Sequence, residues 1–87
     1  MAAIKKHRAG KHRILIVDDH PIFRHGLAQL INQEEDLYVC GEAEDYHGAM
    51  KAVKDLKPDM IIVDITLKDM SGIDLIKEIH KIRRDLA

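Results

Sequence analysis

The hydrophobic positions of the chain follow two different periods in alternation. Three short, mostly apolar runs occupy residues 13–17, 37–43 and 60–64. Continuous apolarity over so few residues is typical of β-strands that are covered on both faces. After each run, apolar residues recur every three or four positions, which is the period of an amphipathic α-helix. The pattern therefore predicts three strands, each followed by a helix.

The predicted helices begin and end at residues with known local preferences. Pro21 suits the first turn of a helix, where a missing N–H has no cost. Asp45 can cap the second helix, and Pro58 ends it because proline disfavours a helical residue before it. Ser71-Gly72-Ile73-Asp74 resembles a capping box that opens the third helix after a polar loop at 66–71. The predicted buried faces are Phe23, Leu27, Leu30 and Ile31; Ala49, Met50, Val53 and Leu56; and Leu75, Ile76, Ile79 and Ile82.

The predicted order of elements places acidic residues at two strand ends. Strand–helix alternation implies a parallel sheet with right-handed crossovers, and ligands of such sheets sit beyond the carboxyl ends of the strands. Asp18 and Asp19 follow the first strand, and Asp64 closes the third. If these two strands are neighbours, three carboxylates converge at one edge of the sheet.

Three converging carboxylates need either a proton or a cation. At 4 Å and an effective dielectric near 20, each like-charged pair costs about 4 kcal/mol. Magnesium fits such a site because it prefers oxygen ligands and is usually held by one or two carboxylates, waters and phosphate oxygens. A carboxylate beside it can act as a nucleophile and form an aspartyl phosphate. The alternative is that Asp18 and Asp19 only cap the first helix.

Length and composition place this pattern in one small domain with an aliphatic core. The chain has 87 residues and an aromatic content of 3%. Its single cysteine, Cys40, excludes an internal disulfide and a multi-cysteine zinc site, and we expect a reduced, cytoplasmic setting. No apolar run approaches the roughly 20 residues that span a bilayer, so we expect no membrane contact. The basic N-terminus has no apolar stretch behind it that would resemble a signal peptide.

Positive charge is concentrated at the N-terminus. Residues 1–12 form a basic tail, whereas residues 14–87 are net acidic. Short basic clusters attract nucleic acid and membrane surfaces, and the alternative is a leader without a role in binding. The acidic body argues against nucleic-acid binding by the folded part. We expect no metal site built from the histidines, because they fall on separate predicted elements without ligand-like spacing: His7, His12, His20, His25, His47 and His80.

Several ordered motifs resemble one known family. Residues 14–21 read Ile-Leu-Ile-Val-Asp-Asp-His-Pro, residues 57–65 read Lys-Pro-Asp-Met-Ile-Ile-Val-Asp-Ile, and Met70-Ser71-Gly72 follows. Together with Phe23-Arg24, Gly26-Leu27 and Gly41-Glu42-Ala43, they are similar to the receiver domain of two-component response regulators, most closely the subfamily with a LuxR-type helix-turn-helix output domain. The resemblance implies an α/β, flavodoxin-like receiver fold of three layers. Its parallel sheet has the order 2-1-3-4-5 in a full domain.

The same resemblance implies a role for each acidic residue. Asp64 is the phosphoacceptor, and Mg²⁺ is held by Asp19 directly, by Asp18 often through water, by Asp64, and by the backbone carbonyl of Thr66. The phosphoryl group comes from a partner histidine kinase. The full-length protein then controls transcription, and it contacts DNA only through an output domain absent from this chain. Such a module assists its own phosphorylation but is not an enzyme with turnover.

The chain departs from the family pattern at several positions. Leu67-Lys68 stands where the loop usually has Met-Pro, which should loosen the loop, and Lys68 can alter the charge near the site. Ser71 replaces an aspartate and caps a helix equally well. Residues 13–87 cover only the first three β-α units, without the hydroxyl residue after the fourth strand and the lysine after the fifth.

This coverage leads to an expectation about assembly. The third strand becomes an exposed sheet edge and the first helix loses a neighbour, so we expect a homo-oligomer, most simply a dimer. One alternative function is a structural or interaction module of receiver ancestry that is not phosphorylated, or a truncated fragment that self-associates. Another is a haloacid-dehalogenase-type phosphatase, but Asp64-Ile65-Thr66 lacks the second acid of that motif.

Overall fold

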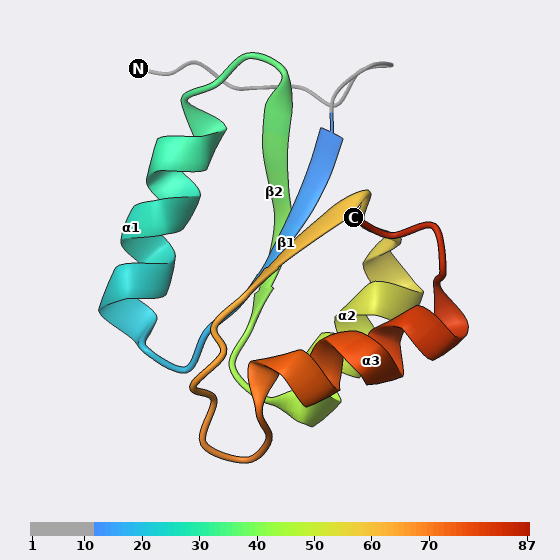
Figure 1. Cartoon of the computed structure of the whole chain (residues 1–87). Coiled ribbons are helices and arrows are strands. Elements are labelled where there is room, and N and C mark those ends of the chain that lie inside the picture. Colours follow the sequence, from blue (N-terminus) through green and yellow to red (C-terminus); the bar gives the residue numbers. More distant parts are fainter. Residues whose placement is uncertain (1–11) are drawn as a thin grey trace.

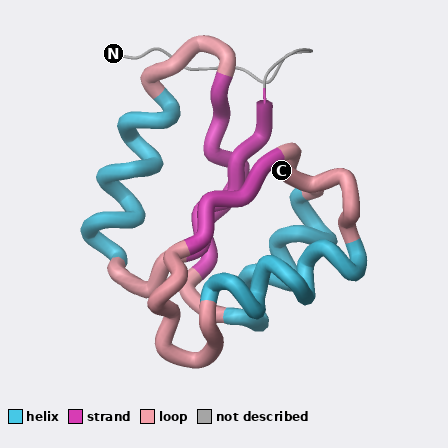
Figure 2. The backbone as a smooth tube through the Cα atoms, viewed as in Figure 1, coloured by secondary structure: helices cyan, strands magenta, loops and turns pink. Residues whose placement is uncertain are grey.

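The computed structural model describes residues 12–87 and contains six elements in strict alternation (Figures 1 and 2). The basic tail predicted for residues 1–12 lies outside the described residues except for His12, which starts the first strand. In chain order the elements are β1 (His12–Val17), α1 (Pro21–Asn32), β2 (Leu37–Ala43), α2 (Tyr46–Leu56), β3 (Met60–Val63) and α3 (Gly72–Ile82).

The three strands form one parallel sheet in the order β2-β1-β3. Helix α1 covers one face, and α2 and α3 cover the other, so the molecule has three layers (Figure 1). This arrangement confirms the predicted α/β class and the adjacency of the first and third strands. Within the described residues, no helix is both long enough and apolar enough to cross a bilayer.

The central strand is buried on both faces, as its continuous apolarity predicts. Leu15 and Val17 pack into the core beneath α2 and α3, whereas Ile14 and Ile16 pack with Ala28 of α1. The larger core is completed by Ala43, Ala49, Val53, Leu67, Leu75, Ile79 and Leu86. Because β1 packs against both helix layers, its position in the sheet determines where Asp18 and Asp19, the residues after Val17, are placed.

The helix starts agree with the predicted caps. The side chain of Asp45 accepts a hydrogen bond from the backbone N–H of Gly48 at 2.7 Å. Ser71 caps α3 by accepting a hydrogen bond from the N–H of Ile73 at 3.2 Å, which is a simple N-cap contact and not the predicted capping box with Asp74. Lys57, at the C-terminal end of α2, adopts a left-handed conformation with φ of 51° before Pro58.

Two of the predicted buried faces are partly wrong. Helix α1 contacts the sheet through Leu27, Ala28 and Ile31. Phe23 and Leu30 are therefore at the margin of the contact, 61% and 63% exposed. In α3, Leu75 and Ile79 are buried as predicted, but Ile76 and Ile82 are exposed. Periodicity identifies an apolar arc, but it does not tell how much of that arc another element covers.

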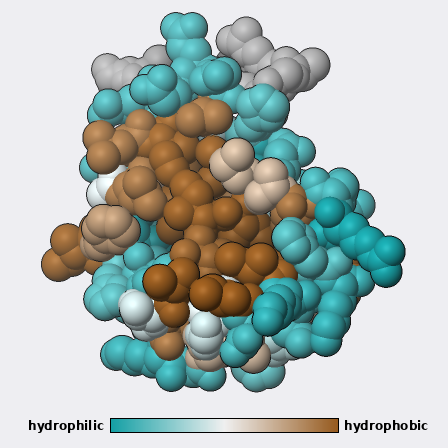
Figure 3. Space-filling model, viewed as in Figure 1, coloured by the Kyte–Doolittle hydropathy of each residue, from teal (hydrophilic) through white to brown (hydrophobic). Residues whose placement is uncertain are grey.

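The outer edge of β3 carries an apolar surface. Met60 and Ile62 of β3 are partly exposed, and Figure 3 shows apolar atoms gathered over this side of the molecule. Among residues 12–87, the C-terminal residue pairs with part of this edge: the backbone N–H of Ile61 donates to the carbonyl of Ala87 at 2.8 Å. The predicted exposed edge is thus present along the rest of β3 in the described part of the chain.

Candidate functional site

The acidic residues lie together at the carboxyl ends of β1 and β3. Val17 pairs with Val63 in the parallel register, and the backbone N–H of Asp64 donates to the carbonyl of Val17 at 2.9 Å. The next residues after Val17 are Asp18 and Asp19, so the backbone brings all three carboxylates to one edge. The structure therefore places Asp18, Asp19 and Asp64 together, as predicted from the order of elements.

A histidine joins this cluster. The Nδ1 atom of His20 lies 2.7 Å from Oδ1 of Asp18, 3.1 Å from Oδ1 of Asp19 and 3.4 Å from Oδ2 of Asp64. One ligand atom from each of these four residues falls within 4.8 Å of the others. We name these four residues the acid pocket. The prediction from the sequence missed His20, although its position directly after Asp19 could have indicated it.

In both Asp19 and Asp64, hydrogen bonds hold one carboxylate oxygen in place. The second oxygen of each carboxylate is directed at the pocket. Oδ2 of Asp19 accepts from the backbone N–H of Lys68 at 3.1 Å. Oδ1 of Asp64 accepts from the backbone N–H of Thr66 at 2.9 Å and from its hydroxyl at 2.7 Å. The remaining oxygens, Oδ1 of Asp19 and Oδ2 of Asp64, both face His20.

The surroundings change the ionisation of two pocket residues. The hydrogen bonds from the backbone and hydroxyl of Thr66 lower the pKa of Asp64, which favours the ionised, nucleophilic carboxylate. The hydrogen bond that the His20 ring donates to Asp18 raises the pKa of His20, and the charges of Asp19 and Asp64 act in the same direction. A protonated imidazole offsets part of the repulsion among the three acids.

Arg24 fixes the backbone at the base of the pocket. Its guanidinium donates to the backbone carbonyl of Asp18 at 2.6 Å and to Oε1 of Glu42 at 2.9 Å. The side chain therefore ties α1 to the ends of β1 and β2. No sequence period indicates this contact, because it depends on how α1 is rotated against the sheet.

The alternative in which Asp18 and Asp19 merely cap α1 does not describe the structure. The N-cap residue of α1 is His20, and no side chain caps that helix by a hydrogen bond. Asp18 instead accepts from the backbone N–H of His20, which precedes the helix, at 2.8 Å. Asp18 is also buried, with 5% of its surface exposed. Buried carboxylates need a compensating charge.

The pocket has the chemistry of a divalent-cation site. Oδ1 of Asp19 is buried and has no hydrogen-bond partner within residues 12–87, although His20 lies nearby. A buried, unpaired carboxylate oxygen costs several kcal/mol unless a cation or proton compensates it. Oxygen ligands from two or three carboxylates suit Mg²⁺. The residues present thus fit the predicted ion.

The loop departure at Lys68 adds a contact with the acid pocket that a proline could not make. A proline at this position has no N–H and could not donate to Asp19, whereas Lys68 does. Leu67 is buried in the main core. The loop is thus attached to the pocket through Lys68 and to the core through Leu67.

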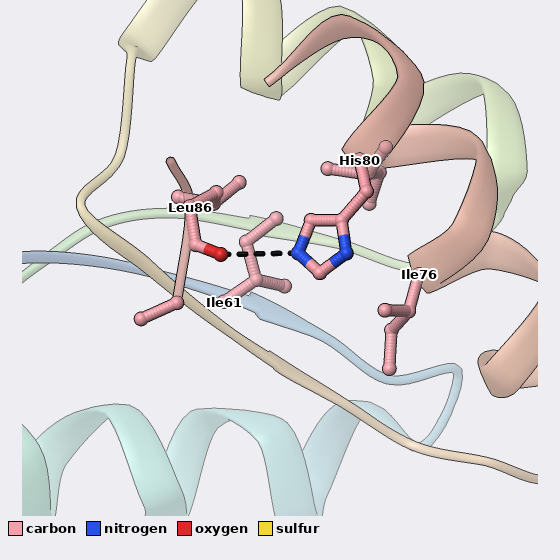
Figure 4. A pocket seen from close by; sticks show the side chains of 6 residues that line it. Ile61, Ile76, His80 and Leu86 are labelled. Carbon is pink, nitrogen blue, oxygen red and sulfur yellow. Dashed lines mark hydrogen bonds between the residues drawn. The ribbon is translucent and has the colours of Figure 1, made fainter. Parts of the chain in front are cut away.

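A second hollow lies away from the acids. Figure 4 shows His80 pointing across this hollow toward Leu86. The hollow is lined by Ile61, Ile76, Ile79, His80, Leu86 and Ala87. Nε2 of His80 lies 3.0 Å from the carbonyl oxygen of Leu86. Because its lining is apolar apart from this histidine, the hollow offers no set of converging polar groups for chemistry.

Comparison with known proteins identifies related chains. A family model described as the response regulator receiver domain matches residues 14–87. The transcriptional regulatory protein YdfI of Bacillus subtilis is 40% identical over 70 residues, which are 80% of this chain and 33% of that protein. A protein-glutamate methylesterase/protein-glutamine glutaminase of Vibrio vulnificus is 39% identical over 72 residues, which are 83% of this chain and 21% of that protein.

A solved structure gives the same result for the fold. The chain matches a two-component response regulator of the LuxR family from Aurantimonas sp. SI85-9A1 with a TM-score of 0.83 and 33% sequence identity. The match covers 87% of this chain and 54% of that one. The chain therefore spans a third or less of the two curated relatives and about half of this structure.

Proposed function

Because the chain belongs to the response regulator receiver domain family, we propose that Asp64 accepts a phosphoryl group while the acid pocket holds Mg²⁺. The sheet order and the solved relatives agree with the receiver fold predicted from the sequence. The observation that carries the proposal is the convergence of Asp18, Asp19 and Asp64, with one oxygen each of Asp19 and Asp64 directed at a common space.

The pocket residues have distinct proposed tasks. Asp19, Asp64 and the backbone carbonyl of Thr66 would hold Mg²⁺ directly, and Asp18 would act through water. When bound, Mg²⁺ neutralises charge on the pocket and on the phosphoryl oxygens. Thr66 orients the Asp64 carboxylate by two hydrogen bonds to Oδ1. Fixed geometry of this kind contributes much of the catalysis in phosphoryl transfer.

The transfer itself is a simple exchange of bonds. One carboxylate oxygen of Asp64 forms a bond to phosphorus while the bond from phosphorus to the donor nitrogen breaks, and that nitrogen keeps the electron pair and takes up a proton. The donor in the cell is, on this proposal, a partner histidine kinase. The chain acts as a phosphoacceptor that assists this step, in contrast to the methylesterase named among its relatives.

Acetyl phosphate labelling tests the proposal. We expect intact-mass spectrometry to show one phosphoryl group on the wild-type chain with Mg²⁺ present, and none with EDTA. Asp64→Asn should abolish labelling, and Asp19→Asn should reduce it strongly. Asp74→Asn, an exposed acid at the start of α3, is the control and should label like the wild type. Labelling of Asp64→Asn at the wild-type level would contradict the proposal.

The role of the longer protein follows from its relatives. YdfI is a transcriptional regulatory protein, and the solved relative belongs to the LuxR family. We propose that phosphorylation of this receiver module controls transcription and that DNA is contacted by an output domain, not by residues 12–87. A cytoplasmic location is part of the proposal, because the lone cysteine fits a reducing compartment.

The exposed apolar surface supports a second candidate, an interaction module that binds another copy of itself. The surface over β3, with Met60 and Ile62, is of the type that marks protein contacts. Sedimentation should show a dimer or larger species that dissociates on Ile62→Glu. A compact monomer that melts cooperatively in calorimetry would contradict this candidate, and it would leave the phosphoacceptor proposal unaffected.

A further inference from the structure

The imidazole of His20 faces the three carboxylates at the point where a cation would bind. We propose that His20 is a fourth, nitrogen ligand of the acid pocket, so that the pocket binds divalent transition-metal ions such as Zn²⁺ more tightly than Mg²⁺. This inference rests on the proposed function for the pocket itself. It adds a ligand and a metal preference that the three acids alone do not give.

The distances around His20 suit ligands that share one ion. Nitrogen and oxygen ligands lie about 2.1 Å from Zn²⁺, so two of them at right angles or at a tetrahedral angle are about 3.0–3.4 Å apart. Nδ1 of His20 lies 3.1 Å from Oδ1 of Asp19 and 3.4 Å from Oδ2 of Asp64. Its 2.7 Å separation from Oδ1 of Asp18 is a hydrogen bond, which an ion would replace after a shift of a few tenths of an ångström.

A second observation points independently to a ligand in the pocket. The side chain of Asp19 is 10% exposed, and its Oδ1 atom is buried without a hydrogen-bond partner within residues 12–87. Its other oxygen is held by the backbone N–H of Lys68, so the carboxylate cannot rotate freely to satisfy Oδ1. An ion between Asp19 and His20 would compensate this buried charge.

His20 is free to adjust to an ion because it lies outside the core. Its side chain is 61% exposed, and the residue stands between Asp19 and the first residue of α1. The backbone N–H of His20 donates to Oδ1 of Asp18, and the ring forms ion pairs with the three pocket acids. The ring can therefore move by a fraction of an ångström without disturbing packed residues.

The donor set determines the metal preference. Mg²⁺ prefers oxygen ligands throughout and keeps several waters. An imidazole nitrogen favours Zn²⁺, Ni²⁺ and Cu²⁺, whose affinities for mixed nitrogen and oxygen sites exceed those of the earlier divalent ions. Removing His20 should thus weaken Zn²⁺ binding much more than Mg²⁺ binding, whereas removing a carboxylate should weaken both.

The test compares ZnCl₂ and MgCl₂ titrations of the whole chain by calorimetry for the wild type and three variants. His20→Asn removes the proposed ligand. His25→Asn is the matched control, because His25 is an exposed histidine of α1 that approaches Glu42, not the pocket. Asp64→Asn tests the pocket itself. Nitrogen-15 spectra of the histidine rings in the wild type report whether Zn²⁺ shifts Nδ1 of His20.

The expected results separate this inference from the proposed function. His20→Asn should weaken Zn²⁺ binding about tenfold or more and leave Mg²⁺ binding within about twofold, and His25→Asn should change neither. If His20→Asn leaves the Zn²⁺ affinity unchanged while Asp64→Asn weakens both metals, the inference is overturned and the magnesium site stands. If Asp64→Asn leaves the Mg²⁺ affinity unchanged, the proposed function fails. If the same variant also leaves the Zn²⁺ affinity unchanged, the inference about His20 is overturned as well.

Discussion

Gly72 is a position at which one added methyl group should disturb both the fold and the acid pocket. This residue begins α3, and its backbone N–H donates to the carbonyl of Ile65 at 3.2 Å. A Cβ atom here would lie 2.5 Å from Cα of Ile65 and 2.9 Å from the carbonyl carbon of Asp64, and it would also meet the Asp64 carbonyl oxygen. All of these atoms are backbone, so no side-chain rotation can make room.

The expected cost of Gly72→Ala follows from these contacts. Inserting a methyl group into a packed site typically costs about 1–3 kcal/mol. Alanine also lowers the conformational entropy of the unfolded chain, which stabilises the folded state by about 0.4–1 kcal/mol. We therefore expect the free energy of unfolding to fall by about 1–2 kcal/mol. With a urea dependence near 1 kcal/mol per molar for a domain of this size, the midpoint should fall by about 1–2 M. Displacement of the Asp64 backbone should also slow acetyl phosphate labelling.

Gly26→Ala provides a matched control within the same chain. Gly26 lies inside α1, and a Cβ atom there would meet nothing within 4 Å. Alanine is favoured over glycine inside a helix by about 0.5–1 kcal/mol, so this variant should be more stable than the wild type. Urea unfolding followed by circular dichroism measures both. Equal stabilisation by the two substitutions would refute the argument that the backbone of α3 packs directly against that of Asp64.

Further predictions concern the loop, the core and the single thiol. Lys68→Pro removes the N–H that Asp19 accepts and should lower stability by about 1 kcal/mol, whereas Lys68→Ala keeps that N–H and should match the wild type in urea. Leu75→Ala empties a fully buried position and should cost about 2–5 kcal/mol, enough to unfold much of the chain by circular dichroism at 25 °C. Burial raises the pKa of the Cys40 thiol, so iodoacetamide at pH 8 should label it more slowly than in urea, and equal rates would contradict this.

Much of the fold could be predicted because the signals were local. The β2 bounds match the predicted run 37–43, and Asp45 caps α2 through its own side chain. The exposure of Phe23 and Leu30 was not predictable in this way. It depends on which part of the apolar arc of α1 meets Ile14 and Ile16, and small Ala28 sits at the centre of that contact.

The acidic residues of the candidate site could be predicted from the sequence, whereas the contacts of His20 and Lys68 could not. The positions of Asp18, Asp19 and Asp64 follow from strand ends and sheet order, which hydrophobic pattern determines. His20 depends on a single side-chain rotation after β1, and the Lys68 hydrogen bond depends on the path of an irregular loop. Neither feature has a period in the sequence, and the adjacency of His20 to Asp19 is the one sequence signal that points to either of them.

The pairing of Val17 with Val63 has a consequence for how mutations act on the module. Side chains of a strand alternate between faces, so the smallest slip of β3 that keeps its inward residues inside is two residues, about 7 Å. That displacement would carry Asp64 beyond the reach of any ion bound to Asp18 and Asp19. On the proposed function, a molecule with β3 shifted in this way would therefore accept no phosphoryl group, whereas smaller displacements within the correct register would slow the transfer.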